Sequence, residues 1–424
     1  MSASSTPGFR FPTRVSGSTR SGSSNHPTRF RLRNRVRHST PRAASPSLSP
    51  VHSVRTTLIS HPHETFDMKV VLIGVGQAGG KVTQSLAQFD YDMGFDAVRG
   101  ALAVNTARAD LQNLDIDTAL IGQDRVKGHG VGGDNELGAQ VMQENATEVL
   151  DELDGRITTE AEAIVVVAGL GGGTGSGGAP MLARELKRIY EKPVYVLGIL
   201  PGRDEGGLYQ ANAGRSLKTA AREADSLLLV DNDAWRGSGD SVAAGFERVN
   251  DAISQRVGLL FASGEAVEGV GESVVDSSEI INTLRGGGIA SIGYASAEAS
   301  EDAGENVNTI TSVTRKALLT SMSLPNAVKA DSALLVVAGD PERLSRKGVE
   351  RARRWVEDQT GSMEVRGGDF PLGSDKIASL IVLSGVERSE RVNEFMERAT
   401  EAANSQGGTT DPDEFTNDQL DGLF

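Results

Sequence analysis

Cysteine is absent from this sequence and histidine is scarce outside its first part, and both absences exclude classes of site. Without cysteine the chain can form no disulfide, no thiolate nucleophile and no cysteine-based metal site. Five of the six histidines precede residue 68, so His129 is alone in the remainder. A Ser–His–Asp triad or a zinc site of several histidines therefore has almost no material in residues 68–424.

A long apolar run is also absent. No hydrophobic stretch of the sequence reaches the roughly 18–20 residues that a membrane-spanning helix requires. We therefore expect no integral membrane segment, and a cytoplasmic protein unless the N-terminal part of the chain directs it elsewhere.

The charge is divided unevenly along the chain. Residues 1–67 contain ten Arg, no Lys and only two acids, Glu64 and Asp67, so this leader carries about +8. The remainder holds 33 basic and 55 acidic residues, a net charge of −22. Such an acidic body argues against nucleic acid as a partner, because phosphate backbones bind basic surfaces.

The leader is rich in Ser, Arg, Pro and Thr and shows no helical or strand periodicity. It could be a transit peptide, a basic nucleic-acid-binding arm or a disordered tail. The most economical interpretation is a mis-assigned start, because Met68 directly precedes the strand-like run KVVLIG. Text rich in Arg, Pro and Ser is also typical of a GC-rich upstream region translated in frame. We predict that Met68 is the true initiator.

From residue 69 onward, short β-branched runs alternate with helical stretches, a pattern typical of a parallel sheet covered by helices. A long helical segment at about 241–261 separates this part from a second, smaller one. We therefore predict an α/β fold of two units joined by a long central helix. Strands are expected at 70–75, 100–105, 163–169, 194–200, 226–231, 289–295, 332–338, 362–366 and 377–384, and further helices at 81–89, 136–152, 179–190, 208–224, 307–321, 341–360 and 388–403.

The first glycine-rich loop, GVGQAGG at 74–80, follows a predicted strand and opens a helix. Glycines there let backbone amides at a helix start approach a phosphate, as in the dinucleotide fingerprint. That fingerprint also needs an acid at the end of the second strand to hold a ribose. Here the second strand ends in Asn105-Thr106, so the loop indicates a phosphate and argues against an NAD-dependent oxidoreductase.

The second loop, GGGTGSG at 171–177, is the stronger signal. Its five glycines in seven residues lie between a predicted buried strand and a predicted helix. Their amides and the positive end of the helix form a pocket for an anion, to which Thr174 and Ser176 can add hydroxyl donors. No Lys follows the glycines, so a P-loop NTPase is disfavoured.

GGGTGSG resembles the signature loop of tubulins and FtsZ, and the other motifs follow in the order of that superfamily. GVGQAGG is similar to its first phosphate loop, Asn105-Thr106 to its second, and GHGVGGD at 128–134 to the loop that meets the γ-phosphate. The resemblance covers about residues 68–400. The strings GQAGGK, KGHGVGGDNELGA, SGGAP, LPGRDEGG and TGSMEVRGGD resemble the archaeal CetZ family in particular.

The resemblance implies a site for GTP or GDP and assigns residues to it. Glu205, in the loop PGRDE, matches the carboxylate that holds the ribose. Asn232 and Asn250 match the two asparagines that read guanine, and Asp251 is an alternative reader. An amide suits guanine because it both donates and accepts hydrogen bonds. The other residues expected around the nucleotide are Gly76, Gln77, Ala78, Gly79, Asn105, Gly130, Gly132, Gly133, Gly171, Gly172, Gly173, Thr174, Gly175, Ser176 and Gly177.

Asp276 and Glu279, in VVDSSEIINTL, match the loop with which members of this superfamily complete the active site of a neighbouring subunit. Acids three residues apart at a helix start share one face, and without the resemblance they would be an ordinary charged helix start. Two carboxylates beside a γ-phosphate can position and polarise water. Because pocket and acids are expected on opposite faces, the resemblance implies a head-to-tail filament that hydrolyses GTP at each interface.

A Mg²⁺ ion is expected with the triphosphate, because charge must be neutralised during phosphoryl transfer. Gln77 matches a position that helps to organise this ion, and no protein metal site is predicted beyond it. The sequence departs from the family pattern at Ala78, where tubulin has a cysteine. It departs again at Leu208 and Tyr209, where bacterial relatives place basic residues.

These motifs predict five segments along the chain. They are a disordered leader at 1–67, a GTP-binding domain at 68–240, a central helix and connection at 241–274, a C-terminal GTPase-activating domain at 275–403 and a disordered acidic tail at 404–424. The tail ends in a small apolar tip that could dock adaptor proteins, or it could serve only to keep the chain soluble.

The resemblance implies a polymerising GTPase that controls archaeal cell shape, as cytoplasmic filaments or near the cell envelope, with paralogues and adaptor proteins as further partners. An FtsZ-type division GTPase is one alternative. A GTP-binding scaffold with little hydrolysis is another, against which the intact Asp276 and Glu279 argue.

Overall fold

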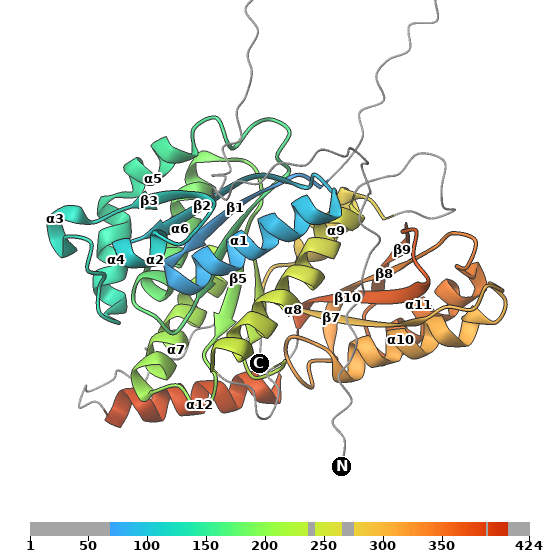
Figure 1. Cartoon of the computed structure of the whole chain (residues 1–424). Coiled ribbons are helices and arrows are strands. Elements are labelled where there is room, and N and C mark those ends of the chain that lie inside the picture. Colours follow the sequence, from blue (N-terminus) through green and yellow to red (C-terminus); the bar gives the residue numbers. More distant parts are fainter. Residues whose placement is uncertain (1–67, 236–241, 265–274, 387–388, 406–424) are drawn as a thin grey trace, which may run out of the picture. The chain divides into compact units, whose positions relative to one another are not determined.

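The computed structural model describes residues 68–235, 242–264, 275–386 and 389–405. Within them, ten strands form one continuous sheet in the order β3-β2-β1-β4-β5-β6-β7-β10-β8-β9 (Figure 1). The predicted leader lies outside the described residues. The strands are β1 (Val70–Val75), β2 (Val98–Asn105), β3 (Asp117–Leu120), β4 (Ala163–Gly169), β5 (Val194–Leu200), β6 (Ser226–Asp231), β7 (Ile289–Glu298), β8 (Ala330–Gly339), β9 (Glu364–Pro371) and β10 (Lys376–Val386).

Helices cover both faces of this sheet. They are α1 (Gly76–Met93), α2 (Arg108–Leu111), α3 (Gln123–Val126), α4 (Asn135–Glu144), α5 (Ala146–Leu153), α6 (Thr174–Ile189), α7 (Gly207–Glu223), α8 (Val242–Ser263), α9 (Ser277–Leu284), α10 (Asn306–Thr320), α11 (Arg346–Thr360) and α12 (Glu390–Ser405). Alternate residues of β1 show the two layers: Val71, Ile73 and Val75 join the core beneath α4 to α7, whereas Val70 and Leu72 join the core beneath α1 and α8. The predicted α/β fold is confirmed.

The two predicted units share the sheet as well as the central helix α8. In the first unit, β1 to β6 are all parallel to their neighbours. β6 then pairs in parallel with β7, through Leu227 opposite Ile289 and Leu228 opposite Ala290. β10 runs antiparallel to β7 and β8, and β9 lies parallel to β8 at the edge. The parallel sheet of the first unit therefore continues into a mixed sheet.

Several bounds differ from the predictions for local reasons. The helix expected at 136–152 is two helices, because the chain leaves helical geometry at Asn145 (φ −107°, ψ 13°), whose side chain donates to Val141 O at 2.8 Å. α11 begins five residues later than expected, because Asp340 accepts the backbone N–H of Glu342 and organises a turn first. β3, α2 and α3 were not predicted, and each has only four residues. The helix start expected at Asp276 is present as α9.

α12 returns to the first unit and packs against α7 (Figure 1). Phe395 and Ala399 of α12 are fully buried and belong to the same core as Leu217 of α7. The helix continues to Ser405, so the first two residues of the predicted tail are helical, and the rest of the tail lies outside the described residues. No helix in the described ranges is long and apolar enough to cross a membrane.

Candidate nucleotide-binding site

Two helices begin side by side at the carboxyl end of the parallel strands. β1 ends at Val75 and α1 begins at once with Gly76, whose positive φ of 76° is accessible to glycine without strain. A Cβ at Gly76 would lie 2.9 Å from the backbone nitrogen of Gly175, in the first turn of α6. The first turns of both helices carry N–H groups without intrahelical partners and the positive ends of the helix dipoles. Both favour an anion here.

A third helix, α4, also begins beside the glycine loop that precedes α6. A Cβ at Gly173 would lie 2.5 Å from Val131 Cγ2 and 3.0 Å from the backbone nitrogen of Asp134. Asp134 is the N-cap of α4 and accepts the N–H of Leu137 at 2.9 Å. A Cβ at Gly172 would meet nothing within 4 Å. The glycine loop is thus packed against protein at Gly173 and open at Gly172, which fits a bound phosphate.

The hydroxyls of the glycine loop have partners within the chain. Thr174 Oγ1 lies 2.7 Å from Oγ1 of Thr106, at the end of β2. Ser176 Oγ donates to the carbonyl oxygens of Gly172 and Gly173. These contacts within the chain fix the shape of the loop, and the role of both hydroxyls as donors to the anion, alongside the backbone N–H groups, stays a prediction.

Asn212 of α7 was not predicted from the sequence. It is 1% exposed, and its Nδ2 lies 2.7 Å from the carbonyl oxygen of Gly133 and 3.2 Å from that of Gly171. One amide therefore joins two of the predicted phosphate loops. One signal in the sequence could have identified Asn212: it is a polar residue on the apolar face of a predicted helix. A polar side chain in such a place is rarely buried without a hydrogen-bond partner.

Asp110 was also missed, and it joins two predicted residues. Its Oδ1 accepts from Gln77 Nε2 at 3.0 Å and its Oδ2 accepts from Asn105 Nδ2 at 3.1 Å. Asn105 Oδ1 in turn accepts the backbone N–H of Thr106 at 2.7 Å and that of Ala107 at 3.2 Å. Gln77 and Asn105 are thus brought together beside the start of α1, as the motif order predicted.

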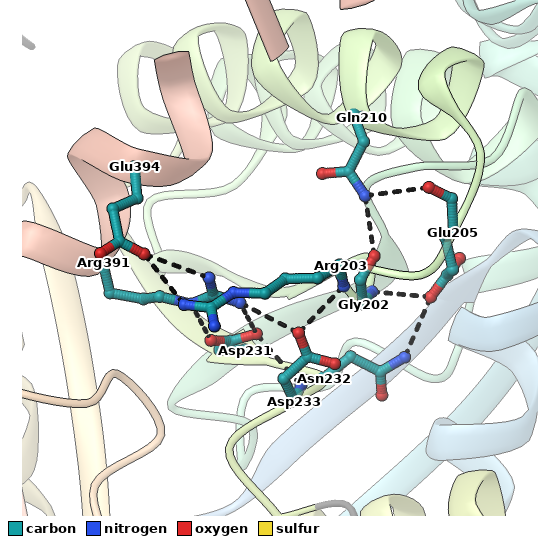
Figure 2. A network of polar contacts seen from close by, with 9 residues as sticks. All are labelled: Gly202, Arg203, Glu205, Gln210, Asp231, Asn232, Asp233, Arg391 and Glu394. Atoms are coloured by element: carbon teal, nitrogen blue, oxygen red, sulfur yellow. Dashed lines mark hydrogen bonds and ion pairs between the residues drawn. The ribbon is translucent and has the colours of Figure 1, made fainter. Parts of the chain in front are cut away.

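At the other end of the site, the predicted ribose acid touches a predicted guanine reader. Glu205 Oε1 accepts from Gly202 N at 2.8 Å and from Asn232 Nδ2 at 3.2 Å (Figure 2). The loop that carries Glu205 adjoins the glycine loop, since a Cβ at Gly171 would lie 3.3 Å from Pro201 Cβ. Glu205 and Asn232 therefore lie next to the phosphate loops.

The remaining predicted base reader, Asn250, comes from the central helix. Asn250 is half-buried on α8, and in the described part of the chain no hydrogen bond joins it to Glu205 or Asn232. Asp251, the alternative reader, is exposed on the same helix. Partial desolvation by its neighbours on the helix surface, and then the charge of Glu247, raise the pKa of Asp251.

The predicted catalytic acids lie in the second unit. Asp276 is the N-cap of α9 and accepts the backbone N–H of Glu279 at 3.0 Å. α9 contacts α8 and the strands β8, β9 and β10. Burial first, and then the charge of Asp276, raise the pKa of Glu279, although Arg366 and Arg353 act in the opposite sense. The N-cap hydrogen bond therefore keeps the two acids together, at the start of a helix that packs on strands of the second unit.

Comparisons with known proteins agree with these features. Residues 69–240 match the Tubulin/FtsZ family GTPase domain, and residues 239–401 match the C-terminal domain of tubulin-like CetZ. The tubulin-like protein CetZ2 of Haloferax volcanii is 65% identical, over 84% of this chain and 100% of the relative. CetZ1 of the same organism is 51% identical, over 79% and 92%.

Solved structures are similar as well. The GTPγS-bound protofilament of Haloferax volcanii CetZ2 has a TM-score of 0.77 at 65% identity and covers 80% of this chain and 100% of that one. The GDP-bound monomer of CetZ1 has a TM-score of 0.73 at 53% identity, over 79% and 99%. An FtsZ dimer from M. jannaschii, 22% identical with a TM-score of 0.61 over 75% and 88%, shares the fold. The chain therefore belongs to the tubulin-like CetZ family, within the tubulin/FtsZ superfamily.

Proposed function

We propose that this chain binds GTP and GDP and assembles head to tail into filaments that hydrolyse GTP where two subunits meet. The observation that carries the proposal is the convergence of three helix starts, those of α1, α4 and α6, on the loop around Gly173, next to the Glu205–Asn232 pair. The similarity to a GTPγS-bound protofilament and to a GDP-bound monomer supports both the ligand and the assembly.

Each end of the pocket has its own task in this proposal. The backbone N–H groups of the glycine loops hold the phosphates, because α1 and α6 present unpaired donors there. Glu205 accepts a hydrogen bond from the ribose, and Asn232 and Asn250 read the guanine edge. The nucleotide-contacting set is the one predicted from the sequence, supported from behind by Asp110 and Asn212.

Magnesium would arrive with the triphosphate. In the described residues no group of three or more His, Asp and Glu side chains is arranged to hold a metal, and Mg²⁺ commonly binds through phosphates and water with few protein ligands. Gln77 fits as one such ligand, because its Nε2 donates to Asp110 and its amide oxygen remains for the ion. When bound, the ion would neutralise charge on the β- and γ-phosphates.

Hydrolysis needs a group that orients and activates water. The phosphate loops are mainly glycine, and the acids beside them are engaged, Asp134 as the cap of α4 and Glu205 with Gly202 and Asn232. We assign this role to Asp276 and Glu279 of the next subunit. The raised pKa of Glu279 suits a proton acceptor, since efficiency improves as the pKa approaches the working pH. An interface between unlike faces of the same chain repeats from subunit to subunit, and it produces a filament when the repeat does not close into a ring.

The division of the chain into a GTP-binding domain at 68–240, a connection at 241–274 and an activating domain at 275–403 belongs to the same proposal. So do a role in archaeal cell shape, a position in the cytoplasm near the envelope, and partners among paralogues and tail-binding adaptors. Depletion that alters shape while cells continue to divide would support this role. Undivided cells would instead favour the FtsZ-type division GTPase.

The direct test is the GTPase rate per subunit against protein concentration, in high-salt buffer with Mg²⁺. The wild-type rate should rise with concentration, because each subunit completes the site of another. Asp276→Asn keeps a good N-cap for α9 and removes only the charge, whereas Asp276→Ala removes both. Both variants should bind GTP and lose hydrolysis.

The outcomes separate the candidate functions. Loss of hydrolysis in Asp276→Ala alone would mean that Asp276 acts only as a helix cap. A flat or absent wild-type rate with tight GTP binding would indicate a nucleotide-dependent scaffold. Failure of the wild type to bind GTP would overturn the proposal.

A further inference from the structure

A buried arginine of α12 forms a two-pronged ion pair with the last residue of β6. Arg391 is 6% exposed and Asp231 is 1% exposed. The guanidinium Nε of Arg391 donates to Asp231 Oδ2, and its Nη2 donates to Oδ1 at 3.1 Å. This fork-like arrangement fixes the orientation of both side chains more tightly than a single charge contact would.

Arg391 binds the residues on both sides of Asn232. Arg391 Nη2 also donates to Asp233 Oδ2 at 3.1 Å. Asp231 and Asp233 immediately flank Asn232 in the chain, so both ends of this short segment are held by one guanidinium (Figure 2). Asp231 Oδ1 further accepts the N–H of Asp233 at 3.1 Å, which closes the turn around Asn232.

The network continues into the loop of Glu205. Asp233 Oδ2 accepts the backbone N–H of Arg203 at 2.9 Å. The next residues of that loop are bound to the Asn232 side chain through Glu205, as described above. Figure 2 shows Arg391 of α12 bound to both aspartates, Asp233 bound to the 202–205 loop, and Glu205 of that loop bound to Asn232.

Apolar residues such as Phe395 and Ala399 also hold α12 on α7. A buried ion pair is commonly no more stabilising than apolar side chains of similar volume, although removal of one partner alone leaves a buried charge uncompensated. Burial disfavours the charged guanidinium, but the hydrogen bonds and charge of Asp231, together with Asp233 and Glu394, outweigh it and raise the pKa of Arg391. The guanidinium of Arg391 is therefore charged, and its two hydrogen bonds to Asp231 fix its orientation.

We propose that Arg391 is a positioning residue that holds Asn232 and Glu205 in the geometry that recognises the guanine base and the ribose. This inference deepens the proposed function and rests on it. It gives α12 a part in nucleotide selectivity, although Arg391 lies 160 residues after Asp231 in the sequence.

The test is nucleotide selectivity of the full chain, with GTP, inosine triphosphate and 2′-deoxy-GTP as probes. Inosine triphosphate lacks the 2-amino group of guanine and 2′-deoxy-GTP lacks a ribose hydroxyl, so each reports on one end of the network. Arg391→Met should weaken GTP binding by roughly tenfold, the effect of losing one well-placed polar contact, and should bring the three dissociation constants closer together. Arg391→Lys keeps the charge without the fork and should fall between wild type and Arg391→Met.

A matched control lies on the same helix. Thr400 lies further along α12, and its hydroxyl donates within the helix, to Met396 O at 2.9 Å, so Thr400→Ala should leave the ratios of the three dissociation constants unchanged. If Arg391→Met does not fold, Asp233→Asn decides, because Asp233 is 28% exposed and tolerates the change more readily. Wild-type ratios in Arg391→Met, or in Asp233→Asn when the former is unfolded, would overturn the inference. A wild type that does not prefer GTP would instead overturn the proposed function.

Discussion

Asn212 of α7 donates its side-chain amide to the carbonyl oxygen of Gly133 at 2.7 Å, and so ties a helix to a predicted phosphate loop. The same nitrogen lies 3.2 Å from the carbonyl oxygen of Gly171. Asn212→Ala would leave buried carbonyl groups without their protein donor, at a cost of about 1–3 kcal/mol. We expect a lower unfolding midpoint and a further loss of GTP affinity, both measurable by thermal unfolding with and without nucleotide.

Thr219, on the same helix, provides the matched control for this change. Its hydroxyl donates only within α7, to Arg215 O at 3.0 Å. Thr219→Ala should therefore leave the GTP affinity at the wild-type value. If Asn212→Ala lowers the unfolding midpoint but retains full GTP affinity, then Asn212 supports the fold without shaping the pocket.

Two adjacent glycines predict opposite results for the same substitution. A Cβ at Gly173 would collide with Val131 Cγ2 at 2.5 Å, so Gly173→Ala should destabilise the protein even without nucleotide. A Cβ at Gly172 meets nothing within 4 Å, so Gly172→Ala should fold normally. It should nevertheless lose the stabilisation that GTP provides, because the methyl group would occupy space next to the phosphate. Full GTP stabilisation of Gly172→Ala would place the phosphates elsewhere.

The pKa of Glu279 predicts the acid limb of the GTPase activity. Burial and the charge of Asp276 raise this pKa, so the acid takes up its proton at a higher pH than an ordinary Glu does. If charged Glu279 activates water, the rate should fall as the pH decreases through this raised pKa, and the limb should be absent from the residual rate of Glu279→Gln.

Protonation of Glu279 does not unfold the protein, so the acid limb expected here is not a loss of folding caused by this group. The folded-state pKa of Glu279 is raised, so the folded protein binds this proton more tightly than the unfolded chain does. The contribution of Glu279 to stability is therefore fully present below the unfolded pKa and is lost as the pH rises through the folded pKa. An activity loss at low pH with an unchanged unfolding midpoint is the expected combination. A parallel loss of activity and folding would assign the limb to other groups.

Local signals explain how much of the fold and site could be predicted. The parallel strands and both glycine loops were identified because β-branched runs and glycine clusters depend on neighbouring residues only. The same holds for the helix start at Asp276 and Glu279, which are three residues apart and which the structure joins through an N-cap hydrogen bond. The sequence also predicted that Glu205 and Asn232 share one end of the site, but only through the family resemblance.

Contacts between segments far apart in the sequence could not be predicted from these local signals. Asp110 meets Gln77 across 33 residues, Asn212 meets Gly133 across 79, and Arg391 meets Asp231 across 160. Each of these polar residues would be an ordinary surface residue if its helix faced water. Their roles follow from which helix packs where, and the return of α12 to α7 has no signature in the periodicity of either helix.

Trp235 offers a direct report on the base-binding end of the pocket. It lies three residues after Asn232, and the guanidinium of Arg256 lies 4.1 Å from its ring centroid. Burial lowers the pKa of Arg256 to about 10, so the cation persists at neutral pH. Nucleotide binding at Asn232 should change the polarity around Trp235 and therefore its emission. The only other tryptophan is Trp355, so Trp355→Phe should keep the GTP-dependent change and Trp235→Phe should abolish it. A fluorescence titration of Arg391→Met should need more GTP to reach the same change in emission. A GTP-dependent change that survives in Trp235→Phe would come from Trp355 and would contradict the prediction.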